Sequence, residues 1–135
     1  MKNLKHIKKE LRNVRFNIER YAAETGWTSS VHLAGLCGIS SYVLFHWFKE
    51  RGYSPTFHIN DCHAFLTVDG YWVDLTLKQF DCDAPKIYLQ KRPWVGDRDV
   101  HAKGDSAKTV KKMKRLFRGW DKSQNPFRQT RLPKL

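Results

Sequence analysis

The dipeptide Asp69-Gly70 is the feature of this sequence that most constrains the fold. It separates two runs rich in β-branched and aromatic residues, 63–68 and 71–76. An Asp-Gly pair favours the two-residue type I′ turn, in which both central residues adopt positive φ angles. The sequence therefore predicts a tight β-hairpin whose strands pair outward from this turn.

The register of that hairpin brings an imidazole and a carboxylate together. Extended outward from the turn, it pairs His63 with Thr76, and Asp74 then lies diagonally across from His63 on the same face. Diagonal partners lie about 7–8 Å apart, which is within reach of these two side chains. An aspartate there can accept a proton from one ring nitrogen and leave the other nitrogen free to act on a nucleophile.

Cys37 is the candidate nucleophile. It precedes an apolar, helix-like pattern that runs to Arg51 and stops at Gly52, a residue suited to a C-terminal cap. The unpaired N–H groups and the dipole at the start of a helix stabilise a thiolate, and a protonated His63 nearby would lower the thiol pKa further. The same N–H groups, beginning with that of Cys37, could bind an oxyanion.

These residues resemble the transglutaminase-like superfamily of papain-like cysteine enzymes. The resemblance covers about residues 30–80: a cysteine opening a helix, a histidine before an aromatic-rich strand, a turn, and Trp-Val-Asp-Leu-Thr. Cys37, His63 and Asp74 occupy the three triad positions. The resemblance implies a papain-like α+β core and chemistry that includes peptide hydrolysis, deamidation, transamidation and acyl transfer. The sequence departs from the animal transglutaminases in its short segment of 26 positions from Cys37 to His63 and in its small size, so it is better compared with compact bacterial or viral members.

Helical periodicity appears on both sides of this segment. Apolar residues recur at steps of three and four over residues 4–21, which predicts an amphipathic helix that ends before Gly26. Because the pattern spans fewer than three heptads, we expect it to pack on the domain core. Residues 106–118 predict a second amphipathic helix with a Lys/Arg face, and residues 87–89 predict a short strand.

Together these elements predict an α+β fold in which N-terminal helices pack on a small antiparallel sheet. A length of 135 residues fits one domain. We expect this domain to cover residues 1–120, with the catalytic core at 27–90 and the basic helix after it. Residues 121–135 contain two prolines and few apolar side chains, which predicts an extended or disordered tail.

Charge is placed unevenly along the chain. Lys and Arg number 25 against 13 Asp and Glu, a formal net charge of +12. Residues 1–20 carry +5 and residues 86–135 carry +11, whereas residues 21–85 carry −4. The basic ends predict attraction to nucleic acid or to an acidic protein partner, and binding to nucleic acid would be phosphate-driven and salt-sensitive. A solvated basic surface is the simpler alternative.

The cysteine count, the hydropathy and the spacing of possible metal ligands predict the cellular compartment and the cofactors. Three cysteines cannot all pair within one chain, which predicts a reducing compartment, the cytoplasm, or a host cytoplasm for a viral protein. We expect no leader and no membrane association, since no apolar run approaches the roughly 20 residues that span a bilayer. The histidines and cysteines nearest the candidate site lack the paired spacing of structural zinc sites, so we expect no metal and no other cofactor. This set is His58, Cys62, His63 and Cys82.

The leading hypothesis is a thiol-dependent acyl-transfer enzyme, a cysteine protease or a protein amidase or deamidase acting on a protein or peptide substrate. Cys37 would attack a carbonyl group with His63 as its base, while Asp74 would hold the imidazolium. Taken singly, each residue has an ordinary alternative: a packed thiol, a structural strand histidine and a turn cap. Their joint pattern favours catalysis.

Residues outside the triad are candidates for binding the substrate and the oxyanion. Trp72 and Trp27 are candidate substrate-binding residues, and Trp27 or His32 could supply a second oxyanion donor. His101 has no recognisable partner in the sequence and receives no role. The alternative function is a basic nucleic-acid-binding or partner-neutralising protein on an inactive papain-like scaffold, with residues 106–118 on an acidic surface.

Overall fold

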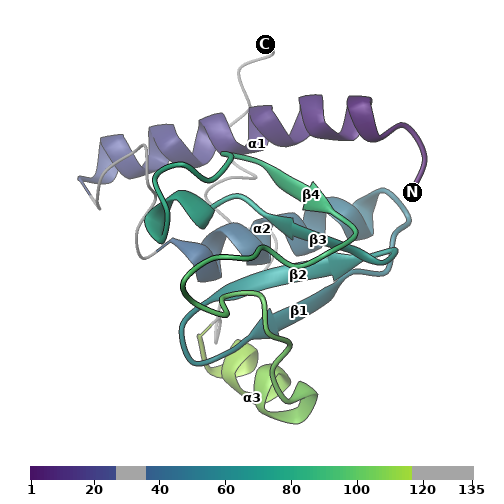
Figure 1. Cartoon of the computed structure of the whole chain (residues 1–135). Coiled ribbons are helices and arrows are strands. Elements are labelled where there is room, and N and C mark those ends of the chain that lie inside the picture. The colour runs from purple at the N-terminus through teal and green to yellow at the C-terminus, as the bar shows by residue number, and fades with distance from the viewer. Residues whose placement is uncertain (27–35, 117–135) are drawn as a thin grey trace.

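A computed structural model of the protein describes residues 1–26 and 36–116 and has an α+β fold (Figure 1). Within these ranges three α-helices accompany one four-stranded antiparallel sheet. The α+β class predicted from the sequence is therefore confirmed. The elements, in chain order, are α1 (Leu4–Thr25), α2 (Cys37–Glu50), β1 (Thr56–Ile59), β2 (Ala64–Val68), β3 (Tyr71–Asp74), the 3₁₀ turn η1 (Leu77–Gln79), β4 (Tyr88–Gln90) and α3 (Ser106–Leu116).

The sheet is a meander in which each strand pairs with the next one along the chain, in the order β1-β2-β3-β4. Its central hairpin is the one predicted: Val68 pairs with Tyr71. Asp69 and Gly70 have φ angles of 51° and 78°, as a type I′ turn requires. Strand β1, which was not predicted from the sequence, extends the sheet by pairing with β2.

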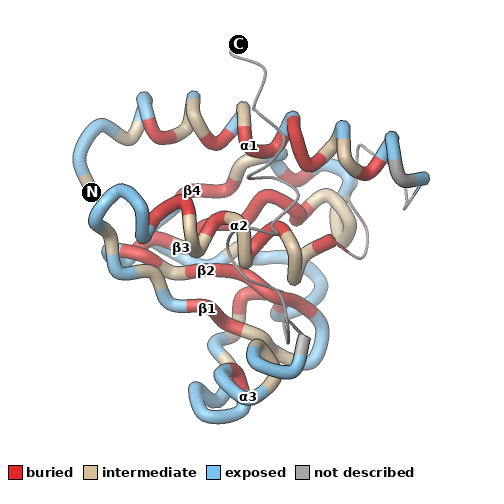
Figure 2. Tube along the Cα trace, turned by 180° about the vertical axis from the view of Figure 1, so that it is seen from behind, coloured by how far each residue is buried: buried red, intermediate tan, exposed pale blue. Residues whose placement is uncertain are grey.

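Helices α1 and α2 share one apolar core with the sheet. In Figure 1, α2 crosses one face of the sheet and α1 runs along its β4 end; Figure 2 shows the buried stripes of both helices. The predicted packing of the N-terminal helix on the domain is confirmed, because its apolar positions are buried in this core. The buried positions of α1 are Ile7, Leu11, Val14, Ile18 and Ala22, and those of the sheet include Leu66, Val68, Val73 and Leu89.

The opposite face of the sheet is covered by irregular chain. The segment 91–105, which joins β4 to α3, passes across this face before α3 packs at the β1 edge (Figure 1). Beneath it lies a second apolar cluster of Leu77, Ala84, Tyr88 and Val100. The β1 edge is joined to α3 through Thr109, whose hydroxyl contacts the backbone of Ile59.

Most predicted element ends agree with the structure to within a few residues. The first helix ends at Gly26, which has a φ angle of 64°, and α2 ends one residue before the predicted Arg51. The strand predicted at 87–89 lies at Tyr88–Gln90. Helix α3 starts at the predicted residue, while 117–118 and the predicted tail at 121–135 lie outside the described residues.

Over residues 1–26 and 36–116, none of the helices is long and apolar enough to cross a bilayer.

Replacing Gly104 with Ala tests the packing of segment 91–105 on the sheet. An added Cβ would clash with the carbonyl oxygen of Ile59, a backbone atom that cannot move without shifting β1. We expect Gly104→Ala to lower the free energy of unfolding by about 1–3 kcal/mol in urea titrations. Ser106→Ala, at an exposed position on α3, is the control and should change it by less than about 0.5 kcal/mol. Equal stability of the two variants would contradict this packing.

Candidate active site

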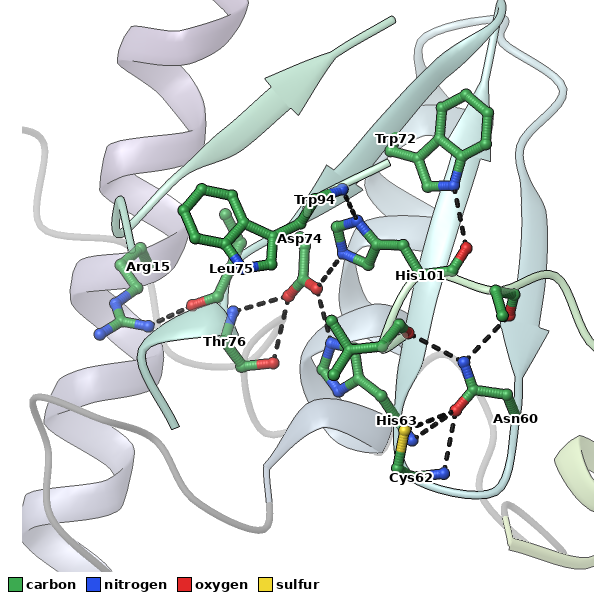
Figure 3. Close-up of polar contacts among 12 residues, drawn as sticks. Arg15, Asn60, Cys62, His63, Trp72, Asp74, Leu75, Thr76, Trp94 and His101 are labelled. Carbon is green, nitrogen blue, oxygen red and sulfur yellow. Dashed lines mark hydrogen bonds and ion pairs between the residues drawn. The ribbon is translucent and has the colours of Figure 1, made fainter. Parts of the chain in front are cut away.

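His63 and Asp74 form a buried hydrogen-bonded pair at the end of the central hairpin (Figure 3). His63 lies just before β2 and Asp74 ends β3. The distance from His63 Nε2 to Asp74 Oδ2 is 2.6 Å, and the two side chains are 0 % and 2 % exposed. The predicted meeting of these two residues across the hairpin is therefore confirmed.

The Asp74 carboxylate receives hydrogen bonds at both oxygens. Oδ1 accepts from the backbone N–H of Thr76 at 2.8 Å and from its hydroxyl at 3.2 Å. Oδ2 accepts from His63 and, at 2.7 Å, from Nε2 of His101. Burial alone would raise the pKa of Asp74, but the charge of His63 and the hydrogen bonds from both histidines hold that pKa well below its usual range. Asp74 is therefore an ionised carboxylate at neutral pH.

That carboxylate sets the protonation of His63. Burial alone would lower the pKa of His63, but the charge and hydrogen bond of Asp74, with a smaller contribution from Cys37, raise the pKa to about 9. The ring also packs edge-on against Phe80, with 4.9 Å between centroids. His63 is thus a buried imidazole that holds its proton at neutral pH.

The thiol of Cys37 lies beside this imidazole. Cys37 is the first residue of α2 and is half-buried. Burial would raise the pKa of its thiol, but hydrogen bonding and charge interaction with His63, together with the backbone N–H of Ala64, lower the pKa overall. The lowered thiol pKa and the raised imidazole pKa move the pair toward thiolate and imidazolium.

Nδ1, the second ring nitrogen of His63, is not bonded to the Asp74 carboxylate. Nδ1 is buried and makes no hydrogen bond of regular geometry with any described residue. The sulfur therefore approaches the ring without completing a regular hydrogen bond, even though the interaction is strong enough to shift both pKa values. Such contacts are often loose in the absence of substrate and tighten when it binds.

His101 is the site residue that the sequence analysis missed. It is 1 % exposed and, as well as contacting Asp74, accepts a hydrogen bond at Nδ1 from the backbone N–H of Trp94 at 2.8 Å. Its ring lies 4.9 Å from that of Phe65 and 6.2 Å from that of His63. It comes from irregular chain 27 positions after Asp74, and no periodicity or motif there indicates its contact.

Two polar residues hold the site to its surroundings (Figure 3). Asn60 accepts the backbone N–H of His63 through Oδ1 at 2.8 Å, and its Nδ2 donates to the carbonyls of Val100 and Ala102 at 2.8 and 3.0 Å. On the opposite side, the buried guanidinium of Arg15 in α1 donates to the carbonyl of Leu75. The hairpin end that carries the carboxylate is thereby tied to both α1 and segment 91–105.

The remaining candidate residues occupy different places. Trp72 is half-buried, and its indole N–H donates to the carbonyl of His101 at 3.3 Å, so its contact is with the covering segment. Trp27 and His32 lie outside the described residues. Cys62 is exposed, with its thiol 3.3 Å from the Asn60 side chain. Residues 61–62 form a bend held by Asn60, so β2 starts only at Ala64.

Ligand atoms of three residues lie close enough together to consider a metal ion. His63, Asp74 and His101 each present one within 4.8 Å of the others, whereas the earlier zinc set does not gather among the described residues. A metal-bound Nε2 would require the proton of His101 at Nδ1, where the Trp94 N–H already donates. The hydrogen-bond pattern therefore favours a proton network over metal ligation.

The chain has no match among protein-family models, curated proteins or solved structures.

The raised pKa of His63 predicts a pH-dependent stability. A group whose pKa rises on folding, here from 6.5 to about 9, adds stability that is fully present below pH 6.5 and is lost as the pH rises through 9. In a Cys37→Ser chain, where no thiol titrates at this position, we expect the free energy of unfolding to fall by roughly 1–3 kcal/mol between pH 6 and 10.

Urea titrations across this range provide the measurement, with Cys37→Ser/Asp74→Asn as the matched control. The amide that replaces the carboxylate would carry no charge to stabilise the imidazolium, so the control should lose most of this pH dependence. The same slope in both chains would mean that the pair does not set the charge of His63.

Proposed function

We propose that the protein is a thiol-dependent acyl-transfer enzyme, a cysteine protease or a protein amidase or deamidase, with Cys37, His63 and Asp74 as its triad. One observation carries the proposal. A buried carboxylate holds Nε2 of an imidazole, whose Nδ1 is left for a thiol with a lowered pKa at the start of a helix. Each member then has the neighbour that its role requires.

The proposed reaction begins with attack of the Cys37 sulfur on the carbonyl carbon of the substrate. In the resting pair His63 already holds the proton as an imidazolium that Asp74 stabilises, and the attacking group is the thiolate of Cys37. The imidazolium then gives its proton to the leaving amine as the carbon–nitrogen bond breaks, which leaves a thioester on Cys37. His63, now neutral, takes a proton from water as the water oxygen attacks the thioester, and cleavage of the carbon–sulfur bond releases the acid and restores the thiolate and the imidazolium. An amine in place of water would give transamidation.

The start of α2 is suited to stabilising the oxyanion that forms in both halves of this reaction. The first N–H groups of a helix have no intrahelical acceptor, and the N-cap residue of α2, Leu36, makes no side-chain capping hydrogen bond. The N–H of Cys37 is therefore a candidate oxyanion donor beside the reacting carbon. A second donor to the oxyanion is also part of the proposal. So is a substrate-binding role for Trp72 and Trp27.

The resemblance to the transglutaminase-like superfamily supports the same assignment. A helix that opens with the cysteine packs beside an antiparallel hairpin that carries the histidine and the aspartate, an arrangement compatible with the papain-like core implied by that resemblance. We infer a compact member of bacterial or viral type that acts on a protein or peptide substrate. Its three free cysteines are compatible with action in the cytoplasm.

Alkylation with iodoacetamide tests the proposed nucleophile. At neutral pH we expect Cys37 to react at least about 10-fold faster than Cys62 or Cys82, although those two are exposed, because its thiol pKa is lowered. His63→Ala should remove this advantage. Peptide mapping by mass spectrometry gives a rate for each cysteine.

His6→Ala removes an exposed histidine on α1 and serves as the control, which should leave all three rates unchanged. Equal labelling of the three cysteines in the wild-type protein would reject the proposal.

A second candidate function, binding to nucleic acid, is favoured by the exposed side of α3. Over residues 1–26 and 36–116, the side chains that line a hollow of about 490 Å³ on this helix are all lysine or arginine. Such a surface attracts phosphate without reading base sequence. Helix α3 packs at the β1 edge, whereas the triad residues belong to α2 and to the β2–β3 hairpin. Phosphate binding on α3 is therefore compatible with the proposed chemistry. The lining residues are Lys108, Lys111, Lys112, Lys114 and Arg115.

A salt titration measures this second function. Association with a fluorescent DNA duplex should weaken steeply as salt increases, and Lys111→Glu/Lys112→Glu should weaken it more than Lys49→Glu on α2 does. Cys37→Ser should not affect it. Absence of association at low salt would reject nucleic acid as the partner, and preferential binding of polyglutamate would instead indicate an acidic protein.

A further inference from the structure

We propose that His101 is a positioning residue that locks the Asp74 carboxylate against His63, as the fourth member of a Cys37–His63–Asp74–His101 network. The inference rests on the proposed function, because it explains how the triad is kept aligned. His101 lies in the segment 91–105 that covers the sheet, and its side chain is 0 % exposed.

The hydrogen bonds of His101 define its tautomer. A backbone N–H can only donate, so Nδ1 of His101, which faces the Trp94 N–H at 2.8 Å, must be the acceptor nitrogen. The ring proton is therefore on Nε2, 2.7 Å from Asp74 Oδ2. His101 is thus a neutral donor to the carboxylate, whereas His63 meets the same oxygen and also interacts with the thiol of Cys37.

This donor fixes the rotation of the carboxylate. Thr76 holds Oδ1 with two hydrogen bonds, and the two imidazoles meet at Oδ2. Turning the carboxylate would break bonds at both oxygens, and these groups are buried from solvent. A neutral donor does this without adding a positive charge that would compete with the His63 imidazolium.

The segment that carries His101 is itself held next to His63. Asn60 Nδ2 donates to the carbonyls on either side of His101, those of Val100 and Ala102. Asn60 Oδ1 accepts a hydrogen bond from the backbone N–H of His63. Trp72 donates to the carbonyl of His101 itself. One amide side chain therefore sets the spacing between the segments that bear the two imidazoles.

Two substitutions separate a positioning role from simple packing. His101→Phe keeps a ring but removes the N–H donor, while His101→Gln keeps an N–H that can reach the carboxylate. In His101→Phe we expect a freer carboxylate to hold the imidazolium less well, so the thiol pKa should rise by about one unit. Alkylation below that pKa should then slow about 10-fold, because the thiolate fraction falls by that factor.

The measurement is the pH profile of Cys37 alkylation from pH 4 to 9, with the folded fraction checked by urea titration. His101→Gln should stay within about threefold of the wild-type rate. If His101 only filled space, His101→Phe would lower the free energy of unfolding but would not shift the acid limb of the Cys37 alkylation profile. A wild-type-like profile for His101→Phe would overturn the inference.

An NMR measurement on the wild-type protein covers the case in which His101→Phe does not fold. The long-range nitrogen–proton correlations of His101 should show a proton on Nε2 and none on Nδ1, and the opposite tautomer would overturn the inference. If wild-type Cys37 itself shows no selective reactivity, the proposed function fails whatever the tautomer of His101. The two failures are thus distinguishable.

Discussion

The buried negative charge of Asp74 is the constraint on which the arrangement of this molecule depends. An ion removed from water costs several kcal/mol unless hydrogen bonds and opposite charge compensate for it. Here the compensation comes from His63, Thr76 and His101, which belong to three separate stretches of chain. The end of the hairpin, the turn after β3 and the segment 91–105 must therefore all be in place before the carboxylate is stable.

The same constraint orients the candidate nucleophile. Because Asp74 takes up Nε2 of His63, only Nδ1 remains for the start of α2, and the N–H of Ala64 adds a second contact to the sulfur. Burial opposes ionisation of Cys37, yet these contacts outweigh it. The lowered thiol pKa is thus a consequence of the hairpin register as much as of the helix position.

Local chemistry explains why part of this site could be predicted from the sequence. The Asp69-Gly70 turn fixes a register, and with side chains alternating along each strand the register alone places His63 near Asp74. His101 could not be found in this way, because the path of an irregular segment is set by distant contacts, such as those of Asn60 and Trp72. The short strand β1 was missed for a related reason, since its four residues carry too little pattern to stand out from the neighbouring turns.

Two buried histidines on one face of the sheet show what the carboxylate contributes. His58 and His63 both stack on Phe65, with centroid distances of 4.9 and 6.3 Å. His58 contacts the hydroxyl of Thr67, and burial together with the positive charge of Lys103 lowers its pKa to about 4. His63 is also deeply buried, yet Asp74 raises its pKa to about 9. Burial and a nearby lysine therefore leave His58 neutral, whereas the charge of Asp74 lets the equally aromatic-packed His63 hold the proton that thiol chemistry requires.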